Sequence, residues 1–93
     1  MTTTTTLALE QLAIDPRVVQ LARALSELQA MIQTKYPGAR FEISQGHDPI
    51  GLHLRAIVDT DDIDEVTDLV LDREVELQIE DGLPVYVFPA RST

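Results

Sequence analysis

The chain of 93 residues contains no cysteine. Disulfide bonds, thiolate metal sites and a cysteine nucleophile are therefore excluded, and the composition is compatible with a reducing compartment. No basic residue precedes the first apolar residues, and the apolar segment 7–14 is interrupted by Glu10 and Gln11. We therefore expect neither a signal peptide nor a membrane-spanning helix, and we expect a cytoplasmic protein.

Basic residues are also scarce. Seven Lys and Arg stand against sixteen Asp and Glu, which gives a formal net charge of −9. The excess lies entirely in residues 47–93, because residues 1–46 contain equal numbers of acidic and basic side chains. Such a field repels a phosphate backbone, so we expect no nucleic-acid partner. Two interpretations of the excess charge remain, namely solubility alone and a basic protein partner.

The remaining composition is that of an ordinary globular domain, with 44% hydrophobic and 25% charged residues. We predict a mobile N-terminal tail and lead-in over residues 1–14, which include a run of threonines, and a single domain over residues 15–93. A chain of this length buries only roughly 60 to 65% of its extended surface, so a homodimer is a reasonable expectation.

Residues 15–35 have the pattern of an amphipathic helix. Asp15 suits the N-cap and Pro16 the first helical position, while Pro37-Gly38 ends the segment. The spacing of the apolar residues, at steps of three and four, predicts one face turned toward a core. These residues are Val18, Leu21, Ala22, Leu25, Leu28 and Ile32.

Two alternating segments follow this helix. Residues 40–44 and 52–58 alternate between apolar and polar side chains, which predicts two half-buried strands. The residues between them include Gly46, Asp48, Pro49 and Gly51, which are typical of a turn. We predict an antiparallel hairpin whose loop is longer than the tightest, two-residue kind.

The segment 62–81 allows two interpretations. It contains neither Gly nor Pro, its first residues are acidic, and Gly82 follows it, which favours one long helix. Against the helix, residues 74–80 alternate strictly between polar and apolar side chains, and Asp81-Gly82 is a common hairpin turn. We favour the helix and keep a strand over 74–80 as the alternative.

The last predicted strand, 84–88, has apolar residues on both faces, so we expect it to be central in its sheet. The order of elements is helix, strand, strand, helix, strand. This order predicts a two-layer α+β fold with two main helices packed on one face of a small sheet. The sheet is expected to have three or four strands and to be mixed or antiparallel.

Groups with catalytic or metal-binding chemistry are few. The acidic cluster 59–65 is the strongest candidate for a metal site, because grouped carboxylates bind Mg²⁺ or Ca²⁺. It does not match an EF-hand loop, since Ile63 stands where that loop has a ligand and Asp64 stands where it has the turn glycine. His47 and His53 lack the spacing of a zinc site. We therefore predict no catalytic residue, no cofactor and no metal. The weak metal candidates are Asp59, Asp61, Asp62 and Asp64.

A helix over 62–81 would carry a second apolar stripe that a surface helix does not need. We expect an interface that contains Leu71, Val75, Ile79 and Ile57.

The leading hypothesis is a non-catalytic, dimeric binding or regulatory module whose acidic half engages a basic partner, such as an enzyme or toxin that it restrains. The alternative is a small metal-dependent enzyme or ligand binder that uses Asp59 to Glu65, together with His47 or His53. A third possibility is a structural domain whose larger partner chain carries the function.

Overall fold

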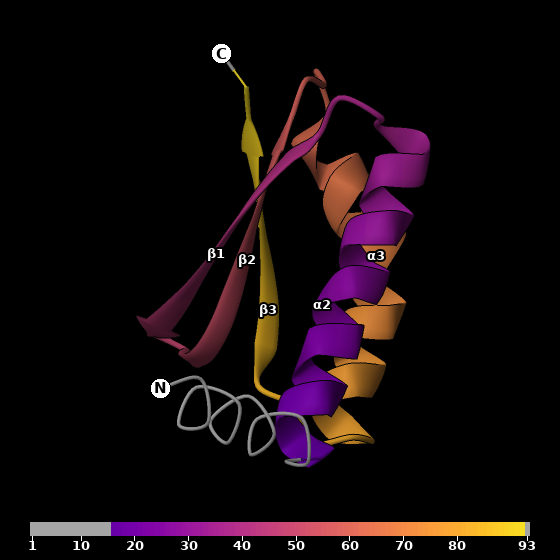
Figure 1. Ribbon diagram of the computed structural model, residues 1–93. Helices are drawn as coiled ribbons and strands as arrows, with labels where there is room; N and C mark the ends of the chain where they lie inside the picture. Colours follow the sequence, from indigo (N-terminus) through magenta and orange to yellow (C-terminus); the bar gives the residue numbers. More distant parts are fainter. Residues whose placement is uncertain (1–15, 93) are drawn as a thin grey trace, which may run out of the picture.

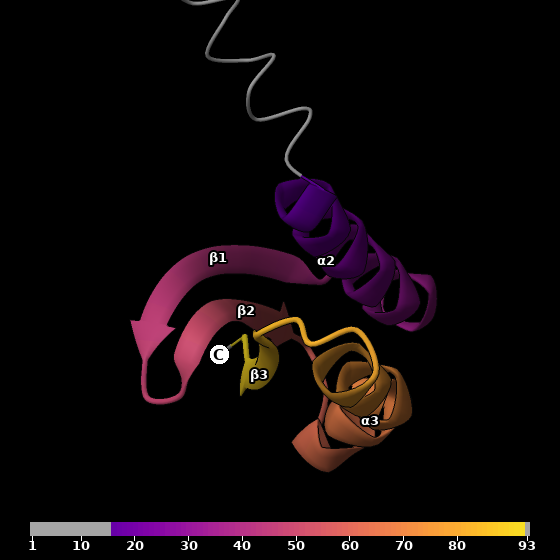
Figure 2. The ribbon, with the colours of Figure 1, turned by 90° about the horizontal axis from the view of Figure 1, so that it is seen from below.

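The computed structural model describes residues 16–92, so the predicted N-cap Asp15 and the predicted tail 1–14 lie outside the described residues. The predicted fold class is confirmed: a mixed three-stranded sheet has both helices on one face (Figures 1 and 2). In chain order, the elements are α2 (Pro16–Lys35), β1 (Arg40–His47), β2 (Ile50–Val58), α3 (Ile63–Ile79) and β3 (Val85–Arg91). Strand β1 is antiparallel to β2, and β3 is parallel to β2.

The core lies between the sheet and the two helices. Leu54, Ala56 and Val58 of β2 point toward the helices and are buried, while the alternate residues point to the opposite, open face of the sheet. α3 packs most closely on β3, α2 packs mainly on α3, and β1 packs mainly on β2. The largest fully buried side chains are Leu28, Ile32, Leu54, Val58, Val66, Val70 and Val85.

The segment 62–81 forms one helix, so the preferred interpretation is confirmed and a strand over 74–80 is wrong. Val66, Val70 and Leu77 are buried on one side of α3, and their helical spacing outweighs the local alternation. The chain turns away from the helix at Gly82, where φ is 65°.

The hairpin between β1 and β2 is tighter than predicted. Pairing continues to His47 and Ile50, so only the two residues between them, joined by a cis peptide bond, form the turn. The two glycines are strand residues rather than loop residues. At Gly51 φ is 152°, and a Cβ would lie 2.4 Å from the carbonyl oxygen of Pro84, so only glycine allows β2 to pass this close to the segment before β3.

β3 is an edge strand, not the predicted central strand, because β2 lies between β1 and β3. Side chains of α3 bind the outer edge of β3 in place of a further strand. Gln78 Nε2 donates to the carbonyl oxygen of Val85 at 2.8 Å, and the Val87 N–H donates to Glu74 Oε2 at 3.0 Å. Pro89, which has no N–H to leave unpaired, lies further along the same strand.

On the open face of the sheet, the aromatic residues of β3 pack around His53 of β2. The ring centroids of His53 and Phe88 are 4.7 Å apart, and Tyr86 meets the imidazole edge-on at 5.9 Å. The imidazole lies over Gly46, where a Cβ would be 2.0 Å from a ring atom, and its Nε2 is 2.7 Å from the Pro49 carbonyl oxygen. These contacts cover the aromatic residues of β3 only in part, and Phe88 remains 41% exposed on the open face of the sheet.

Burial raises the pKa of the Glu74 carboxyl, and the hydrogen bonds from Val87 and Gln78 oppose this shift in part. Because the folded pKa lies above the unfolded one, the folded state holds more protons between the two values. The contribution of this group to the free energy of unfolding is therefore present at acid pH and decreases as the pH rises through the folded pKa.

E74Q keeps an acceptor for the Val87 N–H and removes the charge. We expect E74Q to unfold at neutral pH with a free energy equal to or above that of the wild type, with the difference vanishing in acid, as measured by urea denaturation.

The control for this prediction is E74A, which leaves the Val87 N–H without its acceptor. We expect E74A to lose about 1 to 3 kcal/mol of unfolding free energy. If E74Q were as destabilised as E74A at neutral pH, the charge of Glu74 rather than its hydrogen bond would stabilise this edge.

Candidate interaction surface on helix α3

The solvent-facing side of α3 carries two ridges that run along the helix. Residues four positions apart lie nearly one above another on a helix, so each set with this spacing forms a continuous line. All members of both ridges are exposed. The acidic ridge consists of Asp64, Asp68, Asp72, Glu76 and, just beyond the helix end, Glu80. The apolar ridge consists of Leu71, Val75 and Ile79.

The apolar ridge is the stripe that the sequence predicts, and it faces solvent. Ile79 is 76% exposed, Leu71 44% and Val75 38%. Large apolar side chains exposed at three successive turns form a patch of the kind that marks interaction sites. Ile57, the fourth predicted interface residue, lies elsewhere: it belongs to the odd-numbered residues of β2, on the sheet face that points away from the helices. The structure therefore does not bring the four predicted residues onto one surface.

The acidic ridge opposes the stability of its own helix. Like charges four residues apart destabilise a helix by roughly 0.2 to 0.5 kcal/mol per pair, and the ridge contains a series of such pairs. Glu76 and Glu80 also lie where the helix dipole disfavours negative charge, and the last turn contains no basic residue. Within residues 16–92, the only ion pair of the ridge joins Glu76 to Arg73, at 3.5 Å. Folding does not require this arrangement of charge.

Two ion pairs tie α3 to α2. Arg73 bonds through two nitrogens to both carboxylate oxygens of Glu27, and this bond raises the pKa of Arg73. Lys35 pairs with Glu65, and this bond lowers the pKa of the Glu65 carboxyl. Lys35 is thus engaged by a carboxylate outside the ridge, and Arg73 is shared between Glu27 of α2 and Glu76 of the ridge. The two ion pairs between the helices help to fix the orientation of α3.

The predicted metal candidates lie in the link between β2 and α3 and in the first turn of α3. Asp62 occupies the N-cap of α3, but its side chain makes no capping hydrogen bond. Instead, the Asp62 N–H donates to Thr60 Oγ1 at 3.2 Å. Asp59 and Asp61 precede this turn and are exposed, and Asp64 belongs to the acidic ridge. Within the described part of the chain, no three His, Asp or Glu side chains are grouped so that they could hold a metal ion.

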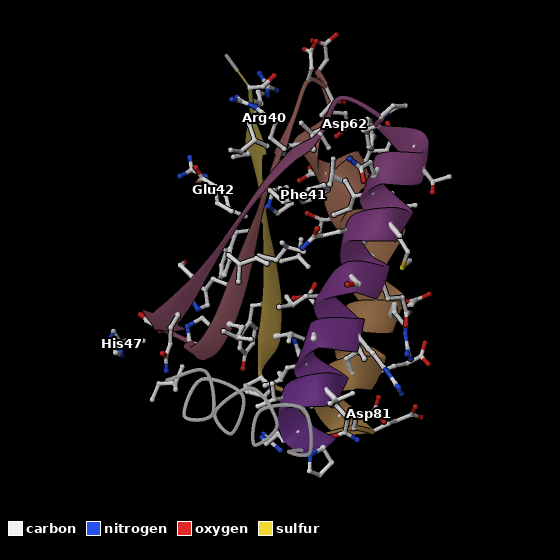
Figure 3. All side chains as sticks on the ribbon, viewed as in Figure 1. Arg40, Phe41, Glu42, His47, Asp62 and Asp81 are labelled. Atoms are coloured by element: carbon white, nitrogen blue, oxygen red, sulfur yellow. The ribbon has the colours of Figure 1, made fainter. Side chains whose placement is uncertain are left out.

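The two histidines do not join this acidic segment. His47 lies at the tip of the hairpin, and Asp62 lies at the opposite end of the strands (Figure 3). The nine residues of β2 separate these ends, a span of about 30 Å in extended chain. His53 lies in the middle of β2, on the open face of the sheet. The structure therefore does not assemble the histidines and the aspartates into one acid–base or ligand set.

The predicted site residues include only the start of the acidic ridge. The rest of the ridge has a clear pattern in the sequence, because acidic residues recur at every fourth position from 64 to 80. The roles of Glu74 and Gln78 at the β3 edge had no comparable signal, since nothing local to α3 indicates which strand it covers.

No helix among residues 16–92 is long and apolar enough to cross a membrane. Comparison of the chain with protein-family models, with curated proteins and with solved structures finds no match.

We predict that neutralising three of the five acids of the acidic ridge stabilises the fold. The variant D68N/D72N/E80Q removes at least one charge from every neighbouring pair and leaves the Arg73–Glu76 pair intact. Its unfolding free energy should rise by about 1 to 2 kcal/mol at low salt. The gain should shrink as salt screens the charges that remain in the wild type. Urea denaturation at two ionic strengths measures both effects.

The matched control is D59N/D61N, which neutralises nearby acids outside the helix. We expect its unfolding free energy to stay within about 0.5 kcal/mol of the wild type. A ridge variant that is no more stable than this control at low salt would show that the ridge carries no repulsive cost.

Proposed function

We propose that this protein is a non-catalytic protein-interaction module, and that the outer face of α3 engages a basic amphipathic segment of a partner protein. The observation that carries the proposal is the placement of the acidic ridge beside the apolar ridge on one exposed helix face. The apolar ridge supplies surface to bury. The acidic ridge selects a partner whose own apolar side chains are flanked by Lys or Arg.

The charge of the whole chain supports the same class of partner. The net charge is −9, and α3 with the two residues after it holds eight acidic side chains and one basic side chain. A concentrated field of one sign raises the association rate of an oppositely charged protein, and salt weakens this effect. A basic enzyme or toxin that the module restrains suits this surface.

The way α3 is held also supports a binding role. Ion pairs at Arg73 and Lys35 fix it to α2, and Glu74 and Gln78 fix it to β3. A helix held on two sides presents its exposed face without a large ordering cost on binding. The alternative of a metal-dependent enzyme has no comparable support, since the described residues 59–65 do not gather with either histidine.

The first experiment uses a defined probe, a synthetic helical peptide with leucines at every fourth position beside a parallel line of lysines. Isothermal titration compares the wild type with L71S/V75S/I79S, which keeps every acid, and with D68N/D72N/E80Q, which keeps the apolar ridge. We expect each variant to bind the peptide at least about tenfold more weakly than the wild type. Circular dichroism checks that both variants remain folded, as the exposure of the changed residues predicts.

If L71S/V75S/I79S binds the peptide as tightly as the wild type, the interaction is charge attraction alone and the proposal fails. The same three proteins, immobilised in parallel, then serve as bait in lysate. A true partner is retained in stoichiometric amount on the wild type, is lost on both variants, and binds the wild type directly once purified.

A further inference from the structure

The two edge strands of the sheet differ in whether their outward backbone groups are bonded. The outer edge of β3 is bound by Glu74 and Gln78 of α3, as described above. Within residues 16–92, no group binds the outer edge of β1. β1 lies at the outer side of the sheet, and β2 separates it from β3 and from the α3 side (Figure 2). An unpaired edge is a template for pairing with another chain.

The register identifies the backbone groups that β1 offers. The Leu52 N–H donates to the carbonyl oxygen of Pro84 at 2.8 Å, so the even-numbered residues of β2 direct their backbone groups toward β3. The odd-numbered residues of β2 therefore bond to β1, where Arg55 stands opposite Glu42. The alternate residues of β1 direct their N–H and C=O groups outward. These are Phe41, Ile43, Gln45 and His47.

The β1 edge has few of the features that usually prevent edge pairing. It contains no Lys and no Pro, and it pairs with β2 over eight successive residues without a bulge. Ile43 lies at its middle, on the helix side of the sheet, and is 50% exposed. Ile50, on the adjoining end of β2, is 73% exposed. A second strand laid along β1 would bury apolar surface as well as pair backbone groups.

Charge favours a second copy of this chain as the occupant of that edge. Copies with a net charge of −9 repel one another, most strongly where the acidic ridges approach. β1 contains one acidic residue, Glu42, and one basic residue, Arg40. It therefore offers a locally neutral edge, on the side of the sheet away from β3, on which α3 packs.

The residues of β1 are complementary to a second β1 in one register. With a two-fold axis at Ile43, the two Ile43 side chains pair with each other, and Phe41 pairs with Gln45 of the second copy. Glu42 then faces Ser44 of the second copy. Moving the axis to Glu42 would place two carboxylates directly opposite, and moving it to Ser44 would separate the two isoleucines.

From the bound β3 edge, the open and neutral β1 edge and this register, we infer that two copies of the chain pair antiparallel along β1, with the axis at Ile43, into one six-stranded sheet. This surface is separate from the face of α3 to which the proposed function belongs. The dimer therefore presents two copies of the acidic and apolar ridges, one near each outer edge of the combined sheet.

Sedimentation of the full chain over a concentration series tests the pairing. The variant I43K places a Lys at the two-fold axis and should raise the dimer dissociation constant at least about tenfold. The matched variant I79K makes the same change on the apolar ridge and should leave the dissociation constant unchanged. Q45P provides a second disruption, because it removes an outward N–H that makes no bond to β2. Circular dichroism confirms that each variant is folded.

Hydrogen exchange gives an independent readout. The amides of Phe41, Ile43 and Gln45 should become protected as the protein concentration rises, while that of Glu42, which bonds to β2, should not respond. A wild type that stays monomeric up to about 1 mM overturns the inference. So does a dimer that I79K dissociates and I43K does not, because that dimer would form through α3.

Discussion

The hydrogen bonds between α3 and the outer edge of β3 organise the rest of the molecule. Glu74 and Gln78 lie one turn apart and bind successive outward groups of β3, at Val87 and Val85. Once one side of a helix is fixed to a strand, the direction of every other side chain on it is determined. The buried residues of α3 then meet the core, and both ridges face solvent. The same bonds close one edge of the sheet, and among residues 16–92 they leave β1 as its open edge.

The order and type of the elements could be predicted from the sequence, because each helix and strand has its own periodicity. The position of each strand in the sheet could not. Tyr86 and Phe88 gave β3 the apolar pattern of a central strand, but they pack around His53 on the open face of the sheet, where Phe88 remains exposed. The predicted length of the hairpin loop was also wrong, since the glycines that indicated a loop are strand residues. Gly46 accommodates the imidazole of His53, and Gly51 accommodates the carbonyl group of Pro84.

The candidate surface was predictable only in part. Leu71, Val75 and Ile79 were identified because their spacing on a helix is independent of tertiary structure. Ile57 was grouped with them because it is apolar, but the alternation of β2 places it on the other face of the sheet. The acidic residues from Asp59 to Glu65 are close in sequence, yet they divide between a link, an N-cap and a helix turn. Closeness along the chain therefore did not produce a common site.

The parallel pairing of β2 with β3 has a consequence for how the fold assembles. The β1–β2 hairpin closes over two residues, so its contacts form between neighbouring parts of the chain. β3 reaches β2 only across the whole of α3, and its pairing closes a much longer loop at a greater entropic cost. Because local contacts close shorter loops, we expect the hairpin to form before the last strand docks. In that order of assembly, the outer edge of β1 would be exposed before the core that supports it is complete.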